Sequence, residues 1–381
     1  MKPIYLDYAA TTPVDPRVKA AMMDCLDADG LFGNPASRSH LYGWLAEEAA
    51  EDARRQVADA LQADPREIVW TSGATEADNL ALKGAALARR ERGRHIISSA
   101  AEHKAVLDPL HWLGEQGFDI TLLNPGADGI ISPQQVADAL RDDTILVSLM
   151  HANNETGVLT DIAAIGALCR AREVLFHVDA AQTFGKEPLS MATLPVDLLS
   201  VCAHKLYGPK GVGALYVRRA PGLVLDAQIH GGGHERGLRS GTLPTHQLVG
   251  FGTAAALAMA ERESEQARLQ ALRARLWAGL EATGAVRLNG HPTQRVAGIL
   301  NVAFPGRDGE LLMTAFAGIA ISSGSACTSA SLDPSHVLTA MGLGAADALS
   351  SLRFSLGRFT SEADVDVAIG VVSEALTRLS A

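Results

Sequence analysis

The feature that most constrains the fold is a regular alternation of short apolar runs with segments of helical periodicity. The apolar runs have the length and residue types of buried strands, and the helical segments separate them. We expect strands at residues 67–71, 94–98, 118–123, 144–150 and 174–178, and helices at 74–92, 104–116, 133–141 and 160–172. Fully apolar strands that alternate with helices predict an α/β protein with a mostly parallel sheet covered on both faces.

A change of pattern near residue 245 predicts a second, smaller unit. Strands at 197–202 and 213–218 flank a Gly/Pro turn and would finish the first sheet as an antiparallel pair. Residues 245–283 contain no proline and carry alternating charges at helical spacing, which predicts one long helix leaving the first unit. We therefore expect a large domain over residues 14–259. A smaller α+β domain would combine residues 1–13 with residues 260–381.

Length, charge and cysteine spacing exclude several classes of protein. A chain of 381 residues with 47% apolar residues can bury sizeable cores. Its net charge of −10 disfavours broad binding to nucleic acid or anionic lipid. We expect no signal peptide and no membrane-spanning segment, and hence a cytoplasmic protein. Four well-separated cysteines without a CxxC pair indicate reduced thiols rather than disulfides or a structural zinc site.

Polar segments follow two of the predicted strands, at the edge where open α/β sheets bind ligands. The segment SGATE at residues 72–76 begins a helix, so its backbone N–H groups and the Thr75 hydroxyl could hold a phosphate. An ordinary helix cap would explain the same residues. Asp179 needs a cationic partner, such as a protonated ring nitrogen, in order to stay ionised in this position. A loop cap is the plainer alternative for Asp179.

A lysine and a histidine also lie just beyond apolar strands. Lys205 stands beside His204 and before a Gly/Pro turn. This placement suits a lysine that forms a Schiff base, because desolvation and cationic neighbours lower the pKa of its amine. A solvated turn lysine is the alternative. His103 follows a strand and opens a helix, so it could act as an acid or base, stack on a ring, or be structural.

The C-terminal third contributes a cysteine and an arginine. Cys327 lies among small residues in SSGSACTSAS (322–331). That composition predicts a mobile loop and an exposed thiol, suited to a nucleophile that moves between a pocket and a partner. An unreactive loop cysteine is the alternative. Arg353 lies in a strand-like stretch and could bind a carboxylate through two parallel hydrogen bonds, or pack its stem on apolar surface with its head in water.

Together these segments resemble the pyridoxal-phosphate-dependent cysteine desulfurases, a group of class V aminotransferase-like enzymes of fold-type I. The matching runs extend in order from Tyr5 to Thr360 and read YLDYAATTPVD, FGNPAS, TSGATEADN, EHKAVL, NNETG, HVDAAQTFGK, HKLYGPKGVGALY, GGGHERGLRSGT, SSGSACTSASLDPSHVL and RFSLGRFT. SSGSACTS and GGGHERGLRSGT resemble the housekeeping branch, which supplies sulfur for iron–sulfur clusters and for thiolation of transfer RNA. The resemblance implies a mostly parallel sheet of the seven-stranded type and a smaller α+β domain.

The resemblance also implies the residues that hold pyridoxal phosphate and do the chemistry. Lys205 would form the Schiff base, His103 would stack on the ring and handle protons, and Cys327 would be the nucleophile that accepts sulfur. The residues expected to bind the cofactor are Ala74, Thr75, His103, Asn154, Asp179, Gln182, Cys202, His204, Lys205 and Thr242.

The resemblance separates these cofactor-binding residues by role. Asp179 would pair with the pyridine nitrogen and Gln182 would reach the ring hydroxyl, while Thr242 would come from a second subunit. Asn154 and Arg353 would bind the substrate carboxylate. Many relatives have serine where this chain has Cys202, and a thiol is a weaker hydrogen-bond donor to the phosphate than a hydroxyl.

The activity implied by the resemblance is conversion of L-cysteine to L-alanine, with the sulfur captured as a persulfide on Cys327. The expected partners are a second copy of the chain, an iron–sulfur scaffold protein and sulfur-relay acceptor proteins, without direct contact to nucleic acid or membrane. Cys327 is also a candidate metal ligand, shared with a scaffold partner around a [2Fe–2S] cluster.

Three other functions remain alternatives to this activity. A selenocysteine lyase or an aminotransferase on the same fold would share Lys205 and Asp179 and have no need of the loop thiol. A catalytically idle scaffold protein would have no need of Lys205, His103 or Cys327. A dinucleotide enzyme is disfavoured, because no GxGxxG opens a strand–helix unit.

Overall fold

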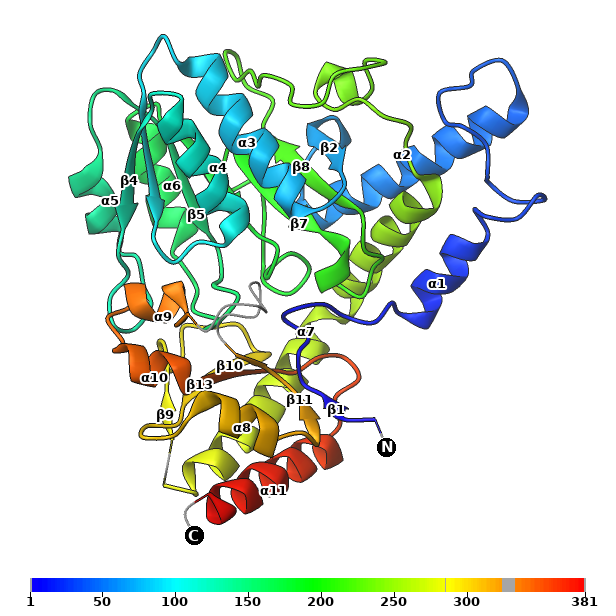
Figure 1. Cartoon of the computed structure of the whole chain (residues 1–381). Coiled ribbons are helices and arrows are strands. Elements are labelled where there is room, and N and C mark those ends of the chain that lie inside the picture. The colour runs from blue at the N-terminus through cyan, green and yellow to red at the C-terminus, as the bar shows by residue number, and fades with distance from the viewer. Residues whose placement is uncertain (1, 285, 324–332, 380–381) are drawn as a thin grey trace.

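The computed structural model describes residues 2–284, 286–323 and 333–379. These residues form a large α/β unit and a smaller unit below it, and the long helix α7 (Thr245–Glu281) runs from the first into the second (Figure 1). Cys327 lies outside the described residues. Within those residues, no helix is both long and apolar enough to cross a membrane.

The large unit is built on a seven-stranded sheet with the order β2-β8-β7-β6-β5-β3-β4. Its strands are β2 (Ile68–Thr71), β3 (His95–Ser99), β4 (Asp119–Leu123), β5 (Thr144–Met150), β6 (Leu175–Asp179), β7 (Leu198–Cys202) and β8 (Gly213–Val217). Strands β3 to β7 pair in parallel, whereas β8 runs antiparallel to both β2 and β7. The mostly parallel sheet and the antiparallel pair at its end are therefore confirmed.

Helices cover both faces of this sheet because its strands are apolar on both sides. One face packs against α3 (Ala74–Arg89) and α4 (Lys104–Glu115). The other packs against α5 (Pro133–Ala139), α6 (Ile162–Ala171), the first half of α7 and the helix α2 (Leu41–Leu61). Phe176 and Leu175 alternate along β6 and enter opposite cores, as expected when successive strand residues point to opposite faces.

The sequence patterns did not predict α1 (Pro16–Met23) or α2. Pro16 at the first turn and the Asp15 side chain, which accepts a hydrogen bond from Arg17 N, start α1. Helix α2 packs against α7 so closely that a Cβ at Gly252 would approach the Ala53 Cα to 2.7 Å. The pattern there is weak because small alanines, rather than large apolar residues, make the contact.

The smaller unit has a four-stranded sheet in the order β12-β13-β10-β9. Its strands are β9 (Arg287–Leu288), β10 (Ile299–Ala303), β12 (Ser322–Ser323) and β13 (Ser351–Ser355), and its helices are α8 (Gly309–Ala315), α9 (His336–Ala340), α10 (Ala345–Leu349) and α11 (Glu362–Arg378). The N-terminal strand β1 (Ile4–Tyr5) pairs in parallel with β11 (Ile319–Ala320), which brings the chain start to this unit.

The core residues of α7 change partners along the helix. Leu248, Phe251 and Ala258 belong to the core of the large unit, whereas Leu269 and Leu276 pack in the core of the small unit. Leu6 joins the same small core. We propose on this basis that the domain boundary lies inside α7, at residues 259 and 260, with residues 1–13 belonging to the small domain.

Candidate active site

A cavity of about 640 Å³ opens where β5, β6 and β7 end, between the large sheet and β13. The sequence-predicted residues that line it are Ala74, Thr75, His103, Asn154, Asp179, Gln182, Cys202, His204, Lys205 and Arg353. They come from both units, so the cavity forms only when the two pack together. Among the predicted residues that the structure describes, Thr242 alone is absent from the lining.

The turn between β2 and α3 presents an uncapped helix start to the cavity. Gly73 occupies the N-cap position and makes no side-chain cap hydrogen bond. A Cβ on Gly213 would lie 2.7 Å from Gly73 backbone atoms, so glycine is needed for this close approach. Of the ordinary cap considered from sequence, only the helix-start glutamate is present, because Glu76 Oε2 accepts a hydrogen bond from Ser72 N at 2.8 Å. First-turn N–H groups near Ala74 and Thr75 face a space that suits a phosphate.

Asp179 ends β6 at the floor of the cavity and is buried. Burial raises the pKa of its carboxyl, while a hydrogen bond from Ala181 N (2.9 Å) and the nearby His103 and Lys205 act in the opposite direction. Asp179 can remain ionised and hold a protonated nitrogen.

Lys205 follows β7 in a single helical turn, Ala203–Lys205. Its Nζ donates a hydrogen bond to the Ala9 carbonyl, which also accepts one from Gln182 Nε2 at 3.0 Å. Lys186 is a second amine near Lys205. Burial lowers the pKa of Lys186 to about 8, and the charge of Lys205 acts in the same direction. The Lys186 amine is thus close enough to Lys205 for the two charges to interact.

His103 is the N-cap of α4, as its position between strand and helix predicted. Its Nδ1 accepts a hydrogen bond from Ala105 N at 3.0 Å, which assigns the ring proton to Nε2. Burial lowers the pKa of His103, with Asp179 acting in the opposite direction. His103 is therefore a neutral ring beside the cavity at neutral pH.

Arg353 enters the cavity from β13 as a buried side chain. Its Nη1 donates to the Asn154 carbonyl at 2.7 Å, and its Nη2 donates to Asp7 Oδ1 at 2.8 Å. The alternative of a stem with its head in water is therefore wrong. Arg353 Nε and Asn154 Oδ1 are buried without a hydrogen-bond partner among the described residues. They are available to a bound molecule that carries both an acceptor and a donor.

Comparisons with known proteins agree over nearly the whole chain. The description Aminotransferase class-V matches residues 4–367. The chain belongs to the aminotransferase class-V family. A protein named Cysteine desulfurase IscS from Shewanella baltica (strain OS223) is 58% identical over 99% of this chain and 93% of its own length.

Solved structures of related proteins have the same fold. A structure titled NIFS-LIKE PROTEIN aligns with a TM-score of 0.92 at 36% identity and covers 99% of this chain and 100% of its own. A structure titled SspA in complex with cysteine aligns with a TM-score of 0.83 at 40% identity, over 94% and 100% of the two chains. The fold-type-I architecture predicted from sequence is thus confirmed, and this class V enzyme is pyridoxal-phosphate-dependent.

The residues around the cavity fit that cofactor. The helix start at Ala74 offers N–H groups for its phosphate, and Gln182 Oε1 is a buried atom without a partner among the described residues. His204 is neutral, because burial and the charge of Lys205 lower its pKa to about 4, so its ring can donate a hydrogen bond. Asp179 and Lys205 supply a carboxylate and an amine to the same cavity.

The three cysteines that the structure describes are poor nucleophiles in this class V enzyme. Cys25, Cys169 and Cys202 are free and buried. Burial raises the pKa of Cys202 to about 11 and that of Cys169 to about 12, and it also raises the pKa of Cys25. All three are therefore uncharged thiols at neutral pH. Across the described ranges, no group of three His, Cys, Asp or Glu side chains could hold a metal ion.

Both flanks of residues 324–332 are held beside the cavity. On one flank, Ser322 pairs with Arg353 in the β12–β13 ladder. On the other, Ser335 Oγ donates to Glu155 Oε2 at 2.5 Å, and His336 Nε2 lies 2.9 Å from the Glu102 carbonyl oxygen. Sequence reasoning missed Glu155 and His336 as anchors, although both lie inside quoted motifs (NNETG and SSGSACTSASLDPSHVL), because no local pattern shows which segment each side chain contacts.

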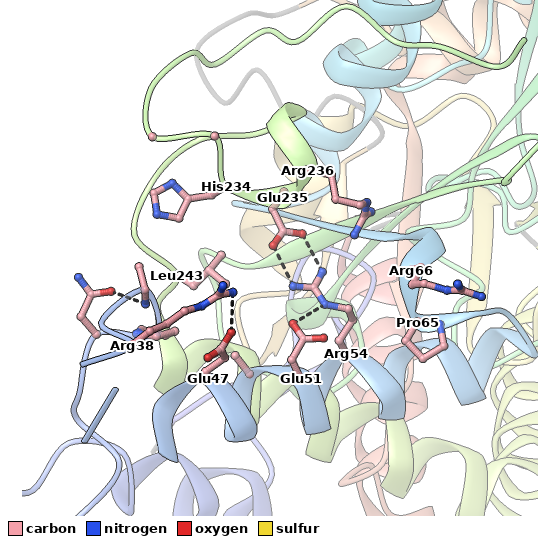
Figure 2. Close-up of a pocket in the computed structure, with 16 residues that line it drawn as sticks. Arg38, Glu47, Glu51, Arg54, Pro65, Arg66, His234, Glu235, Arg236 and Leu243 are labelled. Atoms are coloured by element: carbon pink, nitrogen blue, oxygen red, sulfur yellow. Dashed lines mark hydrogen bonds and ion pairs between the residues drawn. The ribbon is translucent and has the colours of Figure 1, made fainter. Parts of the chain in front are cut away.

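Thr242 is exposed and adjoins Leu243, which lines a second pocket together with residues of α2 such as Glu47 and Arg54 (Figure 2). The loop before Thr242 is fastened by Glu235, whose two carboxylate oxygens accept hydrogen bonds from Arg54 at 2.7 and 2.8 Å. Glu235 also accepts from Trp70 N at 2.8 Å. Glu235 and Arg236 have φ values of 50° and 57°, which are left-handed and unfavourable for residues other than glycine. The buried contacts to Glu235 hold this strained backbone in place.

Proposed function

We propose that this class V enzyme is a cysteine desulfurase, which converts L-cysteine to L-alanine and keeps the sulfur as a persulfide on Cys327. The observation that carries the proposal is one cavity that unites Lys205, Asp179 and Arg353. A chain 58% identical to this one is named a cysteine desulfurase, and a structure titled SspA in complex with cysteine is 40% identical.

The substrate carboxylate would bind at Arg353 and Asn154. The guanidinium is already oriented by the Asn154 carbonyl and by Asp7, and its Nε remains available. A carboxylate is the anion for which a fixed guanidinium has the best geometry. The Asn154 side chain lies beside it and would fix the direction in which the amino acid points.

Pyridoxal phosphate supplies an electron sink for the substrate Cα when it is bound. Asp179 would hold the proton on the pyridine nitrogen, His103 would stack on the ring, and the N–H groups near Ala74 and Thr75 would hold the phosphate. Cys202 and His204 would complete the phosphate site, the former as a weak thiol donor. Lys205 Nζ would take the proton from the substrate Cα and return a proton to Cβ.

The sulfur step is a nucleophilic attack by the Cys327 thiolate. A bond forms between Cys327 Sγ and the substrate sulfur, the substrate Cβ–S bond breaks, and Cβ gains a proton to become the methyl group of alanine. Cys327 follows Ser323 by four residues, and four residues span at most about 14 Å. Because Ser323 is paired next to Arg353 in β13, this length of chain suffices to reach the cavity.

We further propose a homodimer in which Thr242 reaches the cofactor phosphate of the second copy. Thr242 is exposed on its own subunit, on a loop fastened in place. The neighbouring start of α2 exposes large apolar side chains, among them Leu41 at 61%, Tyr42 at 56% and Trp44 at 53%. Contiguous apolar surface of this kind is typical of protein interfaces. A Trp44→Asp variant would sediment as a monomer and bind the cofactor more weakly.

The persulfide would then pass to acceptor proteins in the cytoplasm. A scaffold for iron–sulfur cluster assembly and relay proteins for thiolation of transfer RNA are the proposed acceptors, and Cys327 would share a [2Fe–2S] cluster with the scaffold. These partners rest on the sequence resemblance.

The test compares wild type with Cys327→Ala, both loaded with cofactor, for release of alanine and sulfide from L-cysteine. We expect both proteins to show the yellow colour of bound cofactor, and only wild type to release alanine together with sulfide. Equal turnover by the variant would favour a lyase or an aminotransferase on the same fold. Absence of turnover by wild type with any amino acid would favour an idle scaffold protein.

A further inference from the structure

Three buried carboxyl groups lie around the floor of the active-site cavity, and the chemistry proposed above uses only one. Asp179 faces the cavity from the end of β6. Asp78, on α3, and Glu102, just before α4, are also buried. The three groups are close enough for their charges to interact, because Asp179 contributes to the pKa of both others.

The three carboxyls differ in the partners that could stabilise a negative charge. Asp179 accepts a hydrogen bond from Ala181 N and has His103 and Lys205 nearby. Neither oxygen of Asp78 accepts a hydrogen bond of good geometry from a described residue. Glu102 accepts one bond, from Met150 N at 2.9 Å, through Oε1, while its Oε2 has none among the described residues.

The neighbour of Asp78 that could carry a positive charge is His177, whose Nε2 lies 3.5 Å from Asp78 Oδ1. His177 is itself part of a buried polar row on the sheet. Its Nδ1 lies 2.8 Å from Ser148 Oγ and its Nε2 lies 2.9 Å from Ser200 Oγ. Burial lowers the pKa of His177 to about 3, so the imidazole is neutral and cannot neutralise an Asp78 carboxylate.

We propose that Asp78 is a neutral, protonated carboxylic acid in the folded protein, and that this proton allows Asp179 alone to carry the charge under the cofactor ring. Two carboxyls that share one low-dielectric site cannot both ionise readily, and the group with better partners keeps the charge. Asp179 has those partners. The protonated Asp78 can instead donate its O–H to the row formed by His177 and Ser200. Asp78 is thus a positioning residue, which acts through Asp179.

The directions of the pKa shifts agree with this assignment. Burial raises the pKa of Asp78 well above its ordinary value, and the nearby Asp179 and Glu102 raise it further, whereas Ser200 acts in the opposite direction. Burial likewise raises the pKa of Glu102, and its hydrogen bond from Met150 N opposes this. Glu102 therefore provides a second neutral acid and a matched control.

The first test is infrared difference spectroscopy of the full-length chain, which detects the carbonyl stretch of a protonated carboxylic acid. Asp78→Asn should remove such a band at neutral pH, and Glu102→Gln should remove a second one. Asp179→Asn should remove no such band, because Asp179 is ionised. Loss of a carboxylate band in Asp78→Asn would overturn the proposal. This readout needs no turnover, so it is independent of the desulfurase activity on which the role of Asp179 rests.

The second test is the pH dependence of the melting temperature of the same variants. When folding raises the pKa of a carboxyl group, the free energy of unfolding falls as pH rises above the ordinary pKa of that group. In this range the folded chain binds more protons than the unfolded chain. Asp78→Asn should therefore raise the melting temperature between about pH 6 and pH 8 and reduce its fall with rising pH. Asp78→Leu, which cannot donate to His177 or Ser200, should not reproduce this gain. A drop in Asp78→Asn at neutral pH would indicate an ionised Asp78 paired with His177, contrary to the proposal.

The third test follows the pH at which the bound cofactor changes colour. Asp179→Asn should shift that pH strongly, because it removes the charge under the ring. Asp78→Asn should shift it far less, since one neutral group replaces another. Equal shifts in the two variants would contradict the assignment of the charge to Asp179 alone.

Discussion

The active-site cavity and the second pocket, lined by Arg54 and Glu235, both contain buried charged side chains. They differ in how many of the buried polar atoms have hydrogen-bond partners within the fold. In the cavity, Arg353 Nε, Asn154 Oδ1 and Gln182 Oε1 have no hydrogen-bond partner among the described residues. In the second pocket, Arg54 donates to Glu51, to the Ile68 carbonyl and twice to Glu235 (Figure 2). Buried polar groups normally pair within the fold, so unpaired ones that converge on a cavity indicate a bound molecule.

This difference predicts that the two regions respond differently to mutation. Changes in the cavity should reduce turnover or substrate binding and leave the free energy of unfolding nearly unchanged. Changes at Arg54 or Glu235 should reduce the free energy of unfolding. The comparison would fail if a cavity variant unfolded the protein or if an Arg54 variant left its stability intact.

The largest expected effect is on turnover. Lys205→Ala should lower the rate of alanine release by about 10²–10⁴-fold, because it removes the amine that moves protons at the substrate. Circular dichroism should remain that of wild type. Lys210→Ala is the matched control, since Lys210 also lines the cavity but is exposed, and it should cost much less. A similar loss in both variants would argue for a general electrostatic effect of the two lysines.

The next effect is on stability. Arg54→Met should lower the free energy of unfolding by about 3–5 kcal/mol, because it leaves the buried Glu235 carboxylate without its cation. Urea denaturation measures this loss. Adding Glu235→Leu to Arg54→Met should recover part of it. Arg66→Ala, which breaks an exposed pair with Asp64, should change stability little, and an equal loss there would contradict the contrast between buried and exposed pairs.

A third prediction concerns pH. Burial raises the pKa of Glu155 from 4.5 to about 7, with Ser335 and Arg353 acting in the opposite direction. The folded chain therefore binds more protons than the unfolded chain between these values, and stability falls as pH rises through that range. Glu155→Gln should remove this fall, worth up to about 3 kcal/mol. Urea denaturation at several pH values tests it, and an unchanged pH slope would contradict it.

The smallest predicted effect separates binding from chemistry. Arg353→Lys should raise KM for L-cysteine, because an ammonium group cannot reproduce the fixed guanidinium at the substrate carboxylate. A lost hydrogen bond to a charged group is worth about 1.5–3 kcal/mol, or roughly 10–150-fold. Steady-state kinetics should show most of the change in KM. A change confined to kcat would place Arg353 in the chemical step instead.

The sequence predicted the sheet better than the helices that precede it. Strands such as β5, predicted at 144–150 and found at Thr144–Met150, carry apolar residues on both faces and leave little ambiguity. Helix α2 was missed because it packs through alanines against α7, a tertiary contact that no local pattern records. The long helix α7 was predicted, since 37 residues of helical periodicity give a strong signal.

The residues of the candidate site also fall into those that sequence patterns could indicate and those that they could not. Asp179, Lys205 and His103 could be proposed from sequence because each lies just after an apolar strand. Their shared neighbour Ala9, whose carbonyl holds Lys205 and Gln182, gave no signal, since any residue can offer a backbone carbonyl. Asp78 escaped notice for a related reason. Its importance comes from complete burial without a cation, which is a property of the folded structure.

The most direct test of the central claim is to find where the sulfur goes. The loaded enzyme would be treated with L-cysteine in the absence of reductant, alkylated, digested and analysed by mass spectrometry. We predict one additional sulfur atom on the peptide that contains Cys327, formed in step with alanine, and none on the peptides of Cys25, Cys169 or Cys202. Alanine release without added sulfur on Cys327, or with the sulfur on a buried cysteine, would contradict the account.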